Sequence, residues 1–301
     1  AIYGAYPPGS TFKLITALAG LRTGILTPES IYETNGAFSV GRRVFRDHAG
    51  CRTGEIDFRT AIEQSVNTYF FNFGLQIGAE NLAAEARRFH LHEKTGIELP
   101  NEGSRMIVPD AAWKKKTKGE PWYPGDTANF SIGQGDLQVT PLQMACFLAS
   151  LARGQTQTTP TLLHQAGRPP QRSEPIGLPA EQYQALIEGM ERVITAGTAR
   201  KFCAVPGLRI AGKTGTAQRE NWKDGKRQGM LEIAWFVGFA PVEHPEIAIA
   251  VMVEGDTPDE SYAGGAYAAP VARAIFQKWL EKKNQPATAP VPIFKPVLPR
   301  S

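Results

Sequence analysis

Three strand-like segments near the end of the chain constrain its fold more than any other feature. Residues 208–218, 232–240 and 247–254 are rich in apolar and β-branched side chains. The segments between them are polar or rich in Pro and Gly, which is typical of strands joined as an antiparallel meander. We therefore predict a three-stranded antiparallel sheet in this part of the chain.

Helical periodicity dominates the chain before this sheet and returns after it. Residues 25–56 are expected to be irregular with a short hairpin, and residues 91–139 are expected to be rich in loops. Helices first, strands later and a closing helix indicate an α+β fold, in which an antiparallel sheet with flanking helices adjoins a helical lobe. The spacing of apolar side chains predicts helices over residues 10–22, 57–76, 79–90, 141–153, 179–195 and 266–283.

Composition excludes several classes of protein. A chain of 301 residues with 42% hydrophobic and 21% charged residues is globular. Its net charge of +4 is slight and scattered, so we expect no nucleic-acid partner. The three cysteines are far apart and odd in number, which excludes a disulfide framework. Apolar runs in the sequence fall far short of the roughly 18 residues that a membrane-spanning helix needs.

A serine and a lysine lie three residues apart at the start of the first predicted helix. This spacing places the Ser10 hydroxyl and the Lys13 amine on one helix face. A serine becomes nucleophilic when a base removes its proton, and a lysine can be that base where burial or nearby positive charge disfavours its ammonium form. Ser10 as a helix N-cap and Lys13 as a surface residue explain the same spacing, so this pair alone leaves both interpretations open.

Ser65 and Asn67 form a second polar pair. Positions two apart do not share a helix face, so both side chains point into one cleft only near a helix end or in a loop. The sequence places them early in the second predicted helix. A buried pair that satisfies backbone groups explains the same pattern and, for this pair alone, is the simpler interpretation.

A Lys-Thr-Gly-Thr sequence lies within the first predicted strand. Strand alternation places Lys213 and Gly215 on one face, and Thr214 and Thr216 on the other. Gly215 leaves room for a ligand backbone, and a strand edge there is suited to pair with an extended peptide. Lys213 is a source of positive charge for a substrate carboxylate. A second Lys-Thr-Gly, at residues 94–96, is predicted to be a turn because no pair of strands follows it.

The three motifs together are more specific than any one of them. S-x-x-K, S-D-N and K-T-G motifs in this order are the signature of penicillin-binding proteins and class A β-lactamases. The chain resembles the transpeptidase domain of a class B penicillin-binding protein over almost its whole length. Within that class it is similar to the elongation type, penicillin-binding protein 2, with the division type, penicillin-binding protein 3, as the alternative. Beyond the three motifs, the resemblance rests on residues 6–9, 95–100, 121–127, 132–135, 139–143 and 235–241.

The resemblance implies the penicillin-recognising serine transpeptidase fold, which is also that of β-lactamases, and the activity of a peptidoglycan D,D-transpeptidase. It implies that Ser10 attacks the penultimate D-Ala carbonyl of a stem peptide, with Lys13 as general base. Ser65 would pass a proton to the leaving group, Asn67 would hold the substrate amide, and Lys213 would set the electrostatics. β-Lactams would acylate the same serine.

The resemblance also assigns the substrate-binding strand. Thr214 and Thr216, on either side of Gly215, would meet the substrate carboxylate. The backbone N–H groups of Ser10 and Thr216 would form the oxyanion hole. No cofactor is expected.

Some elongation-type relatives carry a metal site built from Asp, His and Cys near this cleft. Here Val66 stands where those relatives have the Cys, and Thr53 stands where they have the His. Asp47 is a match for one Asp, and His48 and Cys51 are nearby as substitutes. Since two expected ligands are replaced, we expect no metal.

The resemblance further implies the limits of the domain. The transpeptidase domain is expected to cover residues 1–283, with a sheet lobe of about residues 1–20 and 196–283 and a helical lobe of about residues 20–195. A Pro-rich tail is expected over residues 284–301. The family fold has a helix and two strands before its nucleophile, and this chain is expected to lack those strands.

The resemblance also implies the surroundings of the domain. The chain begins with Ala1 rather than Met, so we expect a piece of a longer protein. By resemblance, that protein is held at the periplasmic face of the inner membrane by an upstream anchor. It would work beside a membrane glycan polymerase of the SEDS type and other proteins of the elongation complex.

Three alternative functions use the same motifs. A D,D-carboxypeptidase transfers the acyl group to water instead of an amine. A β-lactamase-like hydrolase needs a deacylating glutamate, for which Glu98, Glu102 and Glu120 are candidates by position alone. A non-catalytic β-lactam sensor or binding domain would bind the drug without turnover.

Overall fold

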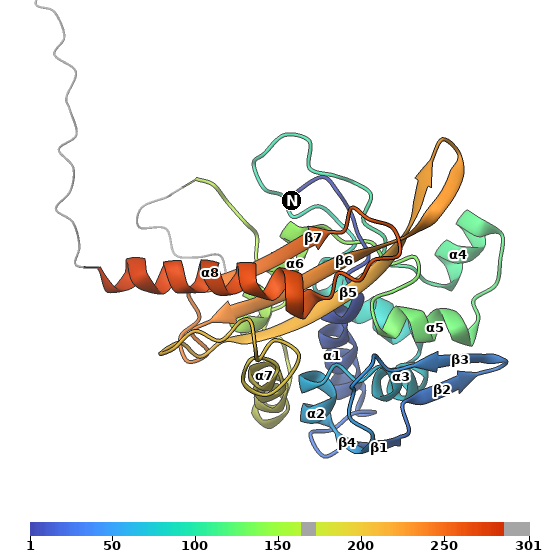
Figure 1. Ribbon diagram of the computed structural model, residues 1–301, viewed down its shortest axis with the longest axis horizontal. Coiled ribbons are helices and arrows are strands. Elements are labelled where there is room, and N and C mark those ends of the chain that lie inside the picture. Colours follow the sequence, from blue (N-terminus) through green and yellow to red (C-terminus); the bar gives the residue numbers. More distant parts are fainter. Residues whose placement is uncertain (164–172, 286–301) are drawn as a thin grey trace, which may run out of the picture.

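A three-stranded antiparallel sheet lies at the centre of the molecule (Figure 1). The computed structural model, which describes residues 1–163 and 173–285, gives the order β5 (Ala211–Lys223), β6 (Lys226–Ala240) and β7 (Ile247–Glu254). The predicted meander is thereby confirmed, and β7 has the predicted bounds.

The hairpin of β5 and β6 is longer than predicted. Its far end projects away from the rest of the molecule (Figure 1) and turns at Asp224 and Gly225, which both have positive φ. An Asp-Gly pair favours such a two-residue hairpin turn. The apolar pattern ends near Gln218 because the projecting end has no core to face, although the strands remain paired as far as Lys223 and Lys226.

Two helices cover the sheet. α8 (Gly264–Asn284) crosses the front of all three strands, and α6 (Pro141–Ala152) lies behind β6 and β7 (Figure 1). α6 begins where predicted, because Thr140 Oγ1 accepts a hydrogen bond from the backbone N–H of Gln143 and Pro141 occupies the first turn. α7 (Ala180–Thr195) packs on β5 and on α2 (Phe58–Glu63).

The segment around Ser10 differs from its prediction. A 3-10 turn, η1 (Gly9–Phe12), leads into α1 (Lys13–Thr23), which is buried from Lys13 to Leu21. Ser10 therefore lies inside a turn and its side chain makes no capping hydrogen bond, so the interpretation of Ser10 as an N-cap is wrong.

The predicted division between the helices over residues 57–76 and 79–90 is confirmed by a kink at Gly78, but the first of these helices contains a further break that was not predicted. α2 (Phe58–Glu63) ends early, and α3 (Asn67–Arg88) starts at Asn67 and continues through a non-helical residue, Gly78. Between α2 and α3, Ser65 takes a left-handed conformation with φ of 56°. The apolar spacing runs on across this break, which is why periodicity alone joined the two helices.

Two short helices lie in the region that was expected to be rich in loops. α4 (Ala111–Lys118) starts at Asp110, whose Oδ1 accepts a hydrogen bond from the backbone N–H of Trp113. α5 (Pro124–Ser131) has proline at its first position. Both start signals are present in the sequence, but the helices are too short to show a clear period.

Residues 25–56 contain two small sheets in place of the single expected hairpin. β1 (Ile31–Thr34) pairs with β4 (Gly54–Asp57), and β2 (Ala37–Val40) forms a hairpin with β3 (Arg43–Arg46). Both sheets lie beside α3 (Figure 1).

The structure describes only part of the predicted C-terminal tail. From residue 286 onward, the predicted Pro-rich tail lies outside the described residues. In the part of the chain that the structure describes, no helix has the length and apolarity needed to cross a membrane. The predicted limits of the two lobes remain a prediction.

Candidate active site

A cleft of about 960 Å³ opens beside the edge of β5. Its walls come from η1, the turn between α2 and α3, strand β5 and the segment that follows α5. Lys13 and Lys213 are completely buried. The other predicted site residues line the cleft, namely Ser10, Ser65, Asn67, Thr214, Gly215 and Thr216.

Lys13 joins the first motif to the second. Its Nζ donates hydrogen bonds to the Ser65 carbonyl oxygen at 2.7 Å, to Ser65 Oγ at 3.1 Å and to Asn67 Oδ1 at 2.6 Å. Ser10 Oγ makes no hydrogen bond to any described residue. In enzymes without substrate, catalytic hydrogen bonds are often long and tighten when substrate binds.

Burial shifts the proton affinity of both lysines. It lowers the pKa of Lys13 to about 7, while the charges of Asp47 and Cys51 oppose this shift. It also lowers the pKa of Lys213 well below its usual value, and the nearby Lys13 adds to that effect. A lysine with a pKa near 7 is partly neutral at neutral pH, as a general base must be.

The turn that carries Ser65 has a strained backbone, and hydrogen bonds from neighbouring residues hold it in place. A left-handed conformation is unfavourable for serine, and such strain is found mainly at functional sites. Asn67 Nδ2 donates to the carbonyl oxygen of Arg46 at 3.2 Å, and the Asp47 carboxylate accepts from the N–H and the hydroxyl of Thr68 at 2.9 and 2.8 Å. The residues after β3 therefore hold the start of α3 in place.

Strand β5 packs directly against η1. A Cβ on Gly215 would lie 2.9 Å from the Pro8 carbonyl oxygen, and a Cβ on Gly9 would lie 2.5 Å from the Thr216 carbonyl oxygen. Gly215 is therefore required for contact between the strand and the Ser10 turn, a reason that the sequence did not show. Thr214 Oγ1 lies 2.6 Å from Thr198 Oγ1, so Thr198 is a further residue of this wall.

Gln134 is a cleft residue to which the sequence assigned no role. Its Nε2 donates to the Thr216 carbonyl oxygen at 3.3 Å, and the preceding Gly133 accepts a hydrogen bond from the backbone N–H of Gly9 at 2.9 Å. The Gly-Gln-Gly sequence at residues 133–135 was part of the resemblance, and this motif was the available signal. The segment after α5 thus contacts both the Ser10 turn and β5.

Gly133→Ala is expected to destabilise the protein by about 2–4 kcal/mol, through a left-handed conformation together with a steric clash. Gly133 has φ of 75°, and an added Cβ would lie 2.0 Å from the Gly9 carbonyl oxygen. Gly207→Ala is the matched control, because Gly207 has φ of 77° and no atom within 4 Å of the added Cβ. Urea unfolding measures both; equal losses of stability would show that the close contact at Gly133 has no energetic effect.

The residues considered for a metal site are engaged elsewhere. Asp47 binds Thr68, and both His48 Nε2 and Cys51 Sγ contact the Gln64 carbonyl oxygen, at 2.9 and 3.8 Å. Within residues 1–163 and 173–285, no group of three or more His, Cys, Asp or Glu side chains is arranged to hold a metal ion.

The candidate deacylating glutamates do not line the cleft. Glu98 accepts from Thr161 and the Leu162 N–H, and Glu120 lies 3.6 Å from Lys114. Glu102 accepts hydrogen bonds from the hydroxyl and N–H of Thr95, and the second Lys-Thr-Gly, which was predicted to be a turn, lies in an irregular segment. None of the three is therefore placed to deliver water to an acyl group on Ser10.

Comparisons with known proteins agree with this arrangement. The family described as "Penicillin binding protein transpeptidase domain" matches residues 1–277. The peptidoglycan D,D-transpeptidase MrdA of Acinetobacter baumannii is 36% identical over 303 residues, covering 94% of this chain and 44% of that protein. PbpA of Mycobacterium tuberculosis, also named a peptidoglycan D,D-transpeptidase, is 32% identical over 299 residues, covering 93% of this chain and 56% of that protein.

Solved structures show the same likeness. The structure of Pseudomonas aeruginosa PBP2 in complex with WCK 5153 superposes with a TM-score of 0.79 at 35% identity, covering 93% of this chain and 62% of that one. The complex between PBP2 and MreC from Helicobacter pylori gives 0.78 at 32% identity, covering 94% and 51%. The chain thus spans about half the length of the curated relatives it matches.

Proposed function

Because this chain belongs to the penicillin-binding protein transpeptidase family, we propose that it cross-links peptidoglycan as a serine D,D-transpeptidase. One observation carries the proposal: a buried Lys13 with a pKa of about 7 binds Ser65 and Asn67 at a cleft that also holds Ser10 and the edge of β5. This arrangement provides a nucleophile, a base and a strand edge for an extended peptide in one place.

The proposed acylation step uses the first two motifs. Ser10 Oγ forms a bond to the penultimate D-Ala carbonyl carbon, and its proton passes to neutral Lys13. The negative charge on the carbonyl oxygen is met by the backbone N–H groups of Ser10 and Thr216. When the C–N bond breaks, the proton moves through Ser65 to the amine of the leaving D-Ala, and an acyl-enzyme ester remains on Ser10.

The remaining site residues position the substrate in this proposal. Asn67 holds the peptide amide on the wall opposite β5. Thr214 and Thr216, with Gly215 between them, bind the terminal carboxylate, and Lys213 sets the charge behind them. The amine of a second stem peptide then attacks the ester, forms the cross-link and returns the proton and the free hydroxyl to Ser10. β-Lactams would acylate Ser10 in the same way.

We also propose surroundings for the whole protein. The relatives and structural neighbours include a PBP2 bound to MreC and a peptidoglycan synthase complex for polymerisation and crosslinking. By analogy, the full-length protein would be an elongation-type enzyme held at the periplasmic face of the inner membrane by an upstream anchor. There it would work with a SEDS-type glycan polymerase and elongation-complex proteins.

The test of the proposed function is a donor–acceptor assay. A stem pentapeptide ending in D-Ala-D-Ala is incubated with the protein and a peptide amine, and products are identified by mass. Cross-linked product with release of D-Ala is the expected result. Hydrolysed donor without cross-linking would instead indicate a carboxypeptidase. Rapid turnover of a β-lactam would indicate a β-lactamase, and a stable β-lactam adduct without reaction of either peptide would indicate a sensor.

A further inference from the structure

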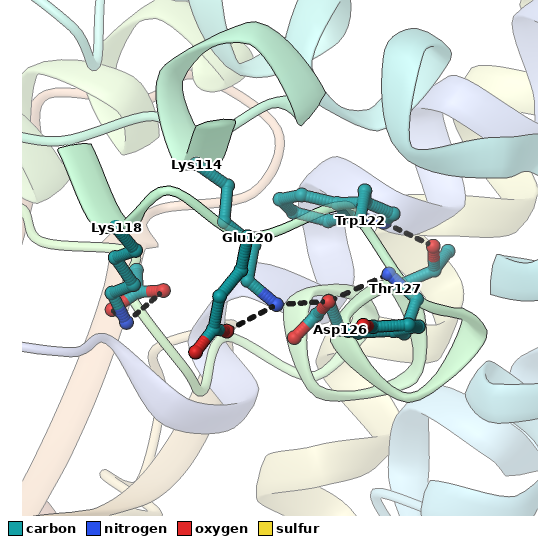
Figure 2. Close-up of polar contacts among 8 residues, drawn as sticks. Lys114, Lys118, Glu120, Trp122, Asp126 and Thr127 are labelled. Carbon is teal, nitrogen blue, oxygen red and sulfur yellow. Dashed lines mark hydrogen bonds and ion pairs between the residues drawn. The ribbon is translucent and has the colours of Figure 1, made fainter. Parts of the chain in front are cut away.

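A partly buried ion pair lies outside the cleft, between α4 and α5. Lys114 Nζ is 2.7 Å from Asp126 Oδ2 and 3.6 Å from Glu120 Oε2. Figure 2 shows Lys114 pointing toward both carboxylates. The Lys114 side chain is 6% exposed, whereas its neighbours Lys115 and Lys116 on the same helix are exposed. The proposed mechanism gives this pair no part.

Asp126 determines how α5 begins. Its Oδ2 also accepts a hydrogen bond from the backbone N–H of Tyr123 at 2.8 Å, which caps the helix. Beside it, Trp122 Nε1 donates to Thr127 Oγ1 at 2.8 Å (Figure 2). The first turn of α5 is therefore fixed to α4 by Lys114.

A second lysine of α4 holds the other end of the same segment. Lys118 Nζ is 2.6 Å from Asp136 Oδ1 (Figure 2). Lys114 and Lys118 are four residues apart and so lie on one helix face. α4 therefore contacts both ends of the segment from residue 126 to residue 136. Lys114 makes the buried contact, and Lys118, which is 42% exposed, makes the contact nearer the solvent.

This segment supports the Ser10 turn. The Gly133 carbonyl oxygen accepts the Gly9 N–H at 2.9 Å, and the Ser131 carbonyl oxygen accepts Thr16 Oγ1 at 2.7 Å. The ring of Phe130 stacks on that of Phe12, with centroids 5.2 Å apart. Together with the contact from Gln134 to Thr216, these bonds join α5 to both sides of the proposed oxyanion hole.

We propose that Lys114 and Asp126 are positioning residues. Their ion pair fixes α5, and α5 in turn holds Ser10 and the Thr216 backbone in the relative position that acylation requires. The inference rests on the proposed function. A partly buried ion pair adds little net stability, because desolvation and solvent screening offset much of its attraction, but here its geometry fixes α4 relative to α5. A displacement of about 1 Å at a reacting centre can lower a rate up to about 100-fold.

The test separates binding from the covalent step. A chromogenic β-lactam is mixed with wild type, Lys114→Met, Asp126→Asn and Lys114→Arg, and saturation kinetics give the dissociation constant and the first-order acylation constant. We expect the acylation constant to fall about tenfold in Lys114→Met and Asp126→Asn, with the dissociation constant within about twofold of wild type. Lys114→Arg keeps the cation and is expected to stay near wild type. Lys116→Met is the matched control and is expected to react as wild type does.

The possible outcomes keep the two proposals apart. Wild type that forms no adduct would count against the proposed function. Wild type that reacts, with Lys114→Met and Asp126→Asn acylating equally fast, would overturn the inference, as would a change confined to the dissociation constant or an equal loss in Lys116→Met. If Lys114→Met fails to fold, Asp126→Asn decides, because its amide oxygen can still accept the Tyr123 N–H.

Discussion

Ser10→Ala is expected to abolish covalent labelling by a β-lactam and to leave the fold intact. Intact mass should show one adduct on wild type and none on the variant, because an acyl bond requires a nucleophilic oxygen at this position. Ser10 Oγ makes no hydrogen bond to a described residue, so its removal leaves no partner unsatisfied. The unfolding temperature is expected to change little, which separates lost chemistry from lost structure.

Ser65→Ala is the control for the Ser10 experiment. Ser65 is the other motif serine in the cleft, and its Oγ lies 3.1 Å from Lys13 Nζ. The proposed role of Ser65 is proton transfer, so this variant should still form the adduct, more slowly by about 10²-fold or more. An adduct on Ser10→Ala, or its absence on well-folded Ser65→Ala after long incubation, would reverse the assignment of the nucleophile.

The structure brings the predicted site residues together, whereas it divides the helices between them differently from the prediction. The three strands could be predicted because each contains a continuous run of apolar and β-branched side chains. β7 has the bounds that were predicted. The motif residues were found because their side-chain chemistry is specific. In the structure, the serine–lysine and serine–asparagine motifs meet through three hydrogen bonds of Lys13.

What the sequence could not show depends on contacts between distant segments. The break at Ser65 has no Gly or Pro to mark it, and the left-handed turn is held by Lys13, which lies 52 residues earlier in the chain. Gly215 and Gly133 were seen as parts of motifs, but their close contacts with Pro8 and Gly9 are visible only after folding. The contact between α4 and α5 likewise depends on an ion pair, Lys114–Asp126, whose two residues are separated by a loop.

The rate of acylation is expected to rise with pH and to level off above about 7. Burial lowers the pKa of Lys13 to about 7. Below that pH Lys13 is mostly protonated and cannot accept the Ser10 proton, so the rate should fall about tenfold for each pH unit. Stopped-flow acylation from about pH 5 to about pH 9 gives the profile.

Lys13→Met tests whether this lysine is the group that titrates. Methionine keeps much of the buried volume but removes the base, so we expect acylation to fall by about 10³-fold and the remaining rate to lose its midpoint near pH 7. Lys94→Met, in the second Lys-Thr-Gly sequence, is the matched control and should keep both rate and profile. Lys213 is the other buried lysine near Lys13, and burial lowers its pKa as well. If Lys13→Met retained the wild-type midpoint, another group would be titrating, and the assignment of Lys13 as the base would be wrong.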